Sequence, residues 1–286
     1  MMNVLKQARA AFSLLKPDQV ESRAQRPVHI GLVAADDAGY AELARFLIPE
    51  ETGQEHRAAV SRMIHLAADP DVPATVDLVL YQQGVERPEG AYTYYPEDPR
   101  ATVSEILKDH DELDLSLARQ FPAFRQAVVE RIIHGVSWEN ALFAFATALP
   151  DVVPSLIELP WALGEFASDM AFLTANQVRM AFVIAAACSK PVGLAHQKAE
   201  MLTIAASAFG WRAIARELAG KIPLGGGLIP KAAIAYAGTF AIGKGLEHYH
   251  RANRSFTREE QKAVYREGLE HGRTAAATIG AGQPRG

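Results

Sequence analysis

The sequence has little of several features that usually point to a function. Its one cysteine, Cys188, among 286 residues excludes a disulfide framework and a metal site built from cysteines. The 29 lysines and arginines nearly balance 33 aspartates and glutamates, so bulk charge does not indicate a nucleic-acid-binding protein. Neither a secretory signal peptide nor an uninterrupted run of 18 apolar residues is visible. We therefore expect a cytoplasmic protein in a reducing compartment.

The pattern along the chain divides it into four parts. Residues 1–26 combine an amphipathic helix with a polar linker. We expect this helix to pack on the protein itself, and the alternative is a basic helix that lies on a membrane surface. Residues 27–112 alternate strand and helix signals, whereas residues 113–272 are almost wholly helical. Residues 273–286 are small, polar and rich in glycine, which is typical of a disordered tail. The predicted fold class is α+β, with a small α/β domain followed by an all-α domain.

Two short apolar runs in the first domain, at residues 28–34 and 76–81, are typical of buried strands. A weaker strand signal covers residues 91–95, and a helix is predicted at 40–47. Strands that alternate with helices favour parallel pairing, and the short length of the domain limits it to three or four strands.

The turn after the first predicted strand stands where a P-loop protein binds phosphate. That chemistry needs G-x-x-x-x-G-K-[ST], in which backbone N–H groups and a lysine hold the phosphates and a hydroxyl holds magnesium. The turn here contains Ala34, Asp36, Asp37, Gly39, Tyr40 and Ala41. Tyr40 replaces the lysine, Ala41 replaces the hydroxyl, and two carboxylates stand where anions would bind. These residues predict a degenerate P-loop-like domain without a cofactor, and the alternative is an unrelated α/β domain that never bound nucleotide.

Helical periodicity in the second domain predicts helices at residues 163–188, 194–209, 211–219 and 232–245. A hinge rich in glycine and proline precedes the last of them, with Gly225, Gly226, Gly227 and Pro230. Polar residues stand out within these apolar helices: Asp169, Asn176, Gln177, Arg179, Arg212 and Arg216. We interpret them as an internal network that ties helices together, and the alternative is the lining of a cavity.

Several strings of the helical domain carry a family resemblance, namely residues 173–177, 210–212, 215–218, 222–223 and 230–239. They resemble the YcjF-like helical domain attached to Era-like GTPases. The resemblance implies a GTPase-like domain at residues 27–112 and a helical domain associated with membranes. It implies no activity, and Tyr40 and Ala41 depart from the family's phosphate-binding residues.

The functional hypothesis is a non-catalytic, pseudo-GTPase-like adaptor or scaffold. Its expected partners are a membrane surface or membrane protein, or a second copy of the chain, and nucleic acid is not expected. The alternatives are a nucleotide-binding switch with an atypical loop and a soluble oligomerising structural protein. The hypothesis includes no catalytic residue, no metal ligand and no cofactor. Residues 222–243 are the best candidate for entering a bilayer, and a buried helix of a soluble bundle explains them equally well. We therefore expect a cytoplasmic protein, and the alternative is a peripheral or re-entrant place at the cytoplasmic membrane.

Overall fold

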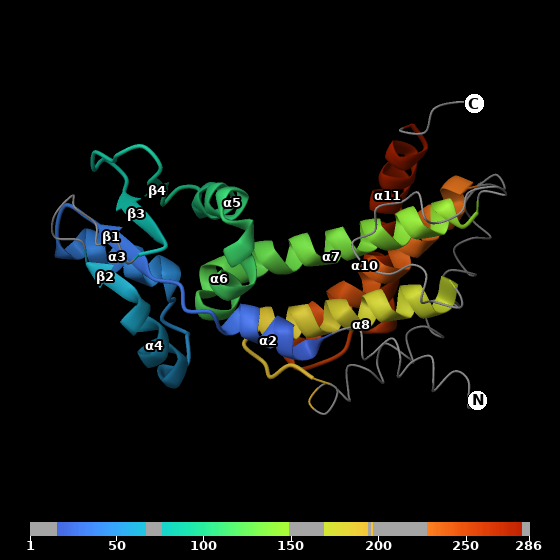
Figure 1. The fold of residues 1–286 in the computed structure, drawn as a ribbon, viewed down its shortest axis with the longest axis horizontal. Coiled ribbons are helices and arrows are strands. Elements are labelled where there is room, and N and C mark those ends of the chain that lie inside the picture. Colours follow the sequence, from blue (N-terminus) through green and yellow to red (C-terminus); the bar gives the residue numbers. More distant parts are fainter. Residues whose placement is uncertain (1–15, 67–75, 149–168, 194–195, 197–227, 282–286) are drawn as a thin grey trace. The chain divides into compact units, whose positions relative to one another are not determined.

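A computed structural model of the chain describes residues 16–66, 76–148, 169–193, 196 and 228–281 (Figure 1). The chain divides into two compact units. The α/β unit comprises Gln19–Glu130 and Ala186–Pro191, and the helical unit comprises Met1–Asp18, Arg131–Ala185 and Val192–Gly286. The predicted boundary at residues 112 and 113 lies before the one found, because helix α7 (Pro122–Ala146) contributes to both units.

A four-stranded parallel sheet forms the centre of the α/β unit, with strand order β2-β1-β3-β4. Its strands are β1 (Ile30–Val33), β2 (Ile64–Leu66), β3 (Leu78–Gln82) and β4 (Tyr92–Tyr94). Ile30, Leu32 and Leu80 are completely buried, as expected for apolar strands covered on both faces. The predicted α+β class and parallel pairing are confirmed. Strand β2 was not predicted, since this short, partly exposed edge strand lacks an apolar run.

Along the chain, the helices that precede, connect and follow these strands are α2 (Pro17–Gln25), α3 (Asp37–Leu47), α4 (Gln54–Val60), α5 (Pro99–Asp109) and α6 (Asp114–Gln120). Two single 3₁₀ turns, η1 (Ser61–Met63) and η2 (Asp111–Leu113), complete this unit. Gly39, Leu43 and Leu47 repeat every four residues and form the buried face of α3. Helix α2 corrects the prediction of a polar linker before residue 27, whereas residues 1–15 lie outside the described part.

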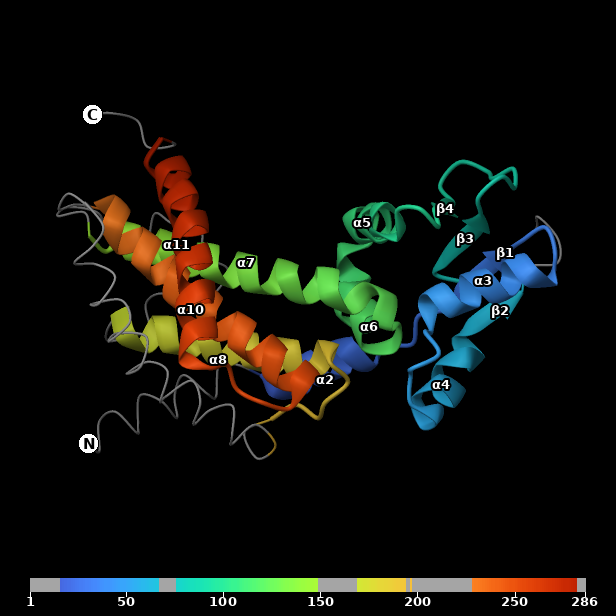
Figure 2. The ribbon, with the colours of Figure 1, turned by 180° about the vertical axis from the view of Figure 1, so that it is seen from behind.

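The helical unit contains most of α7, together with α8 (Asp169–Ala187), α10 (Leu228–Ala252) and α11 (Arg258–Ala281). Helices α10 and α11 lie against each other in both views of the fold (Figures 1 and 2). A Cβ atom added to Gly272 would lie 2.6 Å from the carbonyl oxygen of Ala233. Glycine at this position therefore permits a close approach of the two helix backbones.

The C-terminal part of the chain differs from its prediction. Helix α11 continues to Ala281, so the tail predicted to be disordered from residue 273 is helical up to that point. The composition there is rich in small residues, but Ala275, Ala276 and Ile279 are buried, and burial of one face stabilises the helix. Residues 282–286 lie outside the described part.

Helix α10 starts at Leu228, earlier than the predicted residue 232. The helices predicted at 194–209 and 211–219 lie outside the described residues, apart from His196. Within the part of the chain that is described, no helix has the length and apolar character needed to cross a membrane.

Candidate functional site

The turn between β1 and α3 lies where this sheet topology places ligand sites. Strand β1 ends at Val33 and α3 begins at Asp37, so residues 34–36 make the connection. The chain continues from β1 to β2 on one side and from β3 to β4 on the other. In open parallel sheets, ligands bind at the carboxyl ends of the two strands where the direction of winding changes. The predicted loop residues therefore lie at the candidate site.

Asp36 is the N-cap of α3. Its Oδ1 accepts a hydrogen bond from the N–H of Gly39 at 2.8 Å, and its carbonyl oxygen accepts from the N–H of Tyr40 at 3.0 Å. A helix N-terminus attracts anions because its first N–H groups have no partner within the helix. Here the carboxylate of Asp36 is itself the anion at that position, and this cap stabilises the helix by roughly 0.5–2 kcal/mol.

Gln82, the last residue of β3, covers the same turn. Its Oε1 accepts a hydrogen bond from the N–H of Ala35 at 3.1 Å. A Cβ atom added to Gly39 would lie 2.2 Å from this oxygen, so the side chain of Gln82 is packed on the bare backbone of Gly39. Sequence reasoning missed Gln82. The strand register is the feature that indicates Gln82, because the pairing of Val33 with Tyr81 places Gln82 one residue beyond the end of β1.

The other predicted loop residues take no comparable part. Asp37 is the first helical residue of α3 and is exposed, where its charge complements the helix dipole. Ala34 and Tyr40 are half-buried, and Ala41 is exposed. The turn therefore brings together Asp36, Gly39 and Gln82, all of which satisfy backbone or side-chain groups of the protein itself.

The predicted polar set of the helical unit centres on Asn176. Its side chain is completely buried, and its Nδ2 donates to Oδ1 of Asn140 at 2.8 Å. Asn140 is also completely buried, and its Nδ2 donates to Oγ1 of Thr239 at 2.8 Å. Helices α7, α8 and α10 are thereby joined through one hydrogen-bonded chain, which suits buried polar groups. Asn140 and Thr239 were not singled out from the sequence, although both interrupt apolar helical stretches.

The remaining members of the polar set, and the residues of the predicted hinge, do not lie together in one described site. Arg179 forms an ion pair with Glu139, and Gln177 is half-buried. Pro230 lies in the first turn of α10, where a missing N–H costs no helical hydrogen bond. The side chain of Asp169, both Arg212 and Arg216, and the glycines at 225–227 lie outside the described part.

A pair of histidines lies toward the amino-terminal ends of strands β1 and β2. Nδ1 of His29 lies 2.8 Å from Nε2 of His65, and Oδ2 of Asp77 accepts from the N–H of His29 at 2.8 Å. Oδ1 of Asp77 also accepts from the Arg26 guanidinium at 3.1 Å. The hydrogen bonds therefore link β1, β2 and the start of β3. Among the residues that the structure describes, no group of three or more histidine, cysteine, aspartate or glutamate side chains is arranged to hold a metal ion.

At the β1–α3 turn, side chains of the protein itself occupy the place where a ligand would bind. The N–H groups of Ala35 and Gly39 point to protein oxygens, and the nearest charged group is a carboxylate. Neither a lysine nor a hydroxyl stands at the phosphate-binding positions of the turn. Comparison of the chain with models of protein families, with curated protein sequences and with solved structures found no match.

Proposed function

We propose that this chain is a non-catalytic scaffold of the pseudo-GTPase type, in which the α/β unit keeps a nucleotide-binding layout without binding nucleotide. The observation that carries the proposal is the closure of the β1–α3 turn by Asp36 and Gln82. A phosphate in this turn would displace both side chains and would meet the Asp36 carboxylate. Each lost hydrogen bond costs about 0.5–1.5 kcal/mol, and the like charge adds to that cost.

The helical unit supports a binding role. The buried Asn176–Asn140–Thr239 hydrogen bonds join three of its helices, and the close contact at Gly272 joins α10 to α11, which supports a rigid helical body. Such a body suits a scaffold, which presents fixed surfaces to its partners. The proposed partner is a membrane surface or membrane protein, in line with the resemblance to YcjF-like helical domains. Flotation of the full chain with anionic vesicles tests this partner, and a chain that stays at the bottom of the gradient excludes a membrane surface.

The alternative, a nucleotide switch that uses backbone amides alone, needs N–H groups that are ready to receive phosphate. The N–H groups of Ala35 and Gly39 already have acceptors at 3.1 and 2.8 Å. A switch would therefore have to release Gln82 and the Asp36 cap before each binding event. This extra cost makes the scaffold the favoured function.

Thermal unfolding with and without millimolar GTP or ATP and magnesium tests the proposal. A ligand at 100 times its Kd stabilises a protein by about 2.7 kcal/mol, which is a shift of several degrees. We expect no shift for the unaltered protein. The variant Asp36→Ser with Gln82→Ala keeps a helix cap and frees the N–H of Ala35, and Asp98→Ser at the N-cap of α5 is its matched control. A nucleotide-dependent shift of several degrees in the unaltered protein would overturn the proposal.

A further inference from the structure

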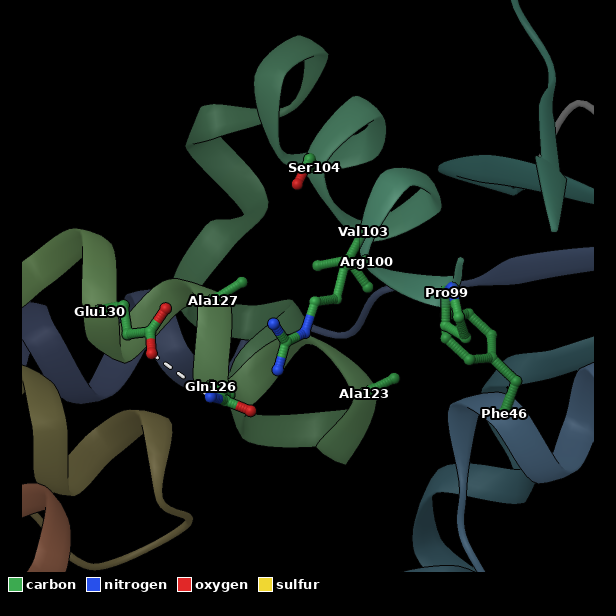
Figure 3. A pocket seen from close by; sticks show the side chains of 9 residues that line it. All are labelled: Phe46, Pro99, Arg100, Val103, Ser104, Ala123, Gln126, Ala127 and Glu130. Carbon is green, nitrogen blue, oxygen red and sulfur yellow. Dashed lines mark hydrogen bonds between the residues drawn. The ribbon is translucent and has the colours of Figure 1, made fainter. Parts of the chain in front are cut away.

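A cavity of about 200 Å³ lies within the α/β unit, between the end of α3 and the first turns of α5 and α7 (Figure 3). Its apolar wall includes the side chains of Phe46, Val103 and Ala127. The ring of Phe46 is held against that of Tyr94, with 4.5 Å between their centroids. Because an engineered apolar cavity of about 150 Å³ binds benzene, this cavity has room for one short aliphatic or aromatic group.

Two donors of α5 line the cavity beside this wall. The guanidinium of Arg100 extends from α5 toward Gln126 of α7 (Figure 3). Ser104 lies one turn further along the same face of α5. In the part of the chain that the structure describes, neither side chain has an ion pair or a hydrogen bond. A guanidinium binds a carboxylate with two parallel hydrogen bonds, and a hydroxyl donates one more.

The carboxylates near the cavity are already engaged by the protein. Oε1 of Glu130 accepts from Nε2 of Gln126 at 3.3 Å, and Glu130 has a further interaction within the chain (Figure 3). Oδ1 of Asp98 accepts from the N–H of Ala101 at 3.3 Å and thereby caps the amino end of α5. Neither carboxylate pairs with Arg100. The cavity therefore offers a ligand one free cation, while the two carboxylates disfavour a second negative charge.

We propose that this cavity binds a small apolar monocarboxylic acid. The carboxylate of the ligand pairs with Arg100 and accepts a hydrogen bond from Ser104, and its hydrocarbon part packs on Phe46, Val103 and Ala127. Inorganic phosphate has no apolar part and carries more charge than one guanidinium balances. A neutral amide keeps the apolar part and loses the ion pair. The inference is independent of the scaffold proposal, because the cavity does not include the β1–α3 turn.

Titration of the full chain with 4-methylpentanoate and with phenylacetate tests the inference. Nuclear magnetic resonance of labelled valine and alanine methyl groups follows it, and the signals of Val103 and Ala127 should shift along a saturable curve. The matching amides and inorganic phosphate should bind about fivefold more weakly or worse, because they lose the ion pair or the apolar contact. Arg100→Gln should weaken binding of the two acids by a similar factor. Ala127→Leu fills the cavity with a good helix former and should prevent binding.

Arg87→Gln is the matched control, because Arg87 is another arginine of the same unit and contacts Glu105 at 4.0 Å outside the cavity lining. This variant should bind the acids like the unaltered chain. Equal affinity for an acid and its amide, or affinity unchanged in Arg100→Gln, would overturn the inference. The absence of saturable shifts with both acids would overturn it as well. A nucleotide-dependent rise in thermal stability would overturn the scaffold proposal alone, so the two failures are distinguishable.

Discussion

The hydroxyl groups of Tyr81 and Tyr236 are buried in different surroundings. Tyr81 is 2% exposed, and its hydroxyl has no hydrogen-bond partner within the described part of the chain. Tyr236 is 4% exposed, and its hydroxyl lies 2.6 Å from Nδ1 of His134. Burial raises the pKa of Tyr236 to about 12, so this hydroxyl keeps its proton in the physiological range. The two residues allow the same substitution to be compared with and without a lost hydrogen bond.

Tyr81→Phe should stabilise the protein by about 1 kcal/mol, because it removes a buried polar group that has no partner. Tyr236→Phe should destabilise it by about 1 kcal/mol, because the hydrogen bond between the Tyr236 hydroxyl and His134 is lost. Urea unfolding of both variants beside the unaltered chain measures the two free energies. Destabilisation by Tyr81→Phe would show that its hydroxyl has a partner in solution.

Residues that act through local sequence were easier to predict than residues that act through strand register. Asp36 and Gly39 were singled out at the β1–α3 turn because an apolar run, a short loop and a helix pattern follow one another there. Gln82 reaches the turn only because Val33 pairs with Tyr81. The register of a parallel pair depends on the packing of the whole sheet, and no short motif encodes it.

At the scale of elements, α11 shows how a local signal can outweigh composition. Thr257 precedes the helix, and its N–H donates to Oε2 of Glu260 at 2.7 Å, while the N–H of Glu260 donates to Oγ1 of Thr257 at 3.2 Å. This reciprocal pair is a capping box, and Arg254 adds two hydrogen bonds to Glu260 at 3.0 and 2.9 Å. Prediction from composition emphasised the glycine-rich end of α11 and missed the strong start signal at Thr257.

The capping box should make the stability of α11 depend on pH. The hydrogen bonds from Arg254 and then from Thr257 lower the pKa of Glu260 from 4.5 to about 2. The folded state therefore favours the charged carboxylate. Its stabilisation is complete above pH 4.5 and is lost as the pH falls toward 2.

Glu260→Gln keeps an acceptor for the N–H of Thr257 and removes the titrating group. The unaltered protein should therefore lose more stability between pH 5 and pH 2 than this variant does. Thermal unfolding followed by circular dichroism across that range measures the difference. Glu259→Gln removes a carboxylate from the same turn and is the control. Equal pH dependence in Glu260→Gln and in the unaltered chain would contradict the role of the capping box.

At the scale of the whole molecule, the α/β unit is assembled from two distant parts of the sequence. Arg119 donates through Nη1 to the carbonyl oxygens of Ala186 at 3.2 Å and Lys190 at 3.1 Å. Arg125 donates through Nε to the carbonyl oxygen of Ala187 at 2.9 Å and through Nη2 to Oγ of Ser189 at 3.1 Å. Carbonyl groups at the end of a helix have no partner within it, and these arginines satisfy them.

This assembly explains why the limits of the two units were not predictable from the sequence. Helical periodicity predicted one helix through Cys188 and treated the change of composition near residue 112 as a domain boundary. The structure assigns Ala186–Pro191 to the α/β unit because two arginines more than 60 positions earlier bind it. Long-range hydrogen bonds to backbone carbonyls have no pattern along the chain, since any residue type supplies the acceptor.

Arg125→Met tests how strongly this long-range contact stabilises the α/β unit. Methionine keeps much of the apolar volume, whereas the carbonyl of Ala187 and the hydroxyl of Ser189 lose their donor. Burial lowers the pKa of Arg125, and the adjacent charge of Arg119 lowers it further, which indicates a guanidinium removed from water. Because carbonyl groups without a partner cost roughly 1–3 kcal/mol when buried, we expect a loss of about 2 kcal/mol in the free energy of unfolding.

Arg87→Met is the control for this substitution, because its contact with Glu105 is an exposed pair at 4.0 Å. Exposed pairs of this kind contribute about 0–1 kcal/mol, so this variant should unfold almost like the unaltered chain. Urea unfolding of both variants gives the comparison. If Arg125→Met lost no more stability than Arg87→Met, residues 186–191 would be held to the α/β unit mainly by apolar packing, and the two arginines would only cover the end of α8.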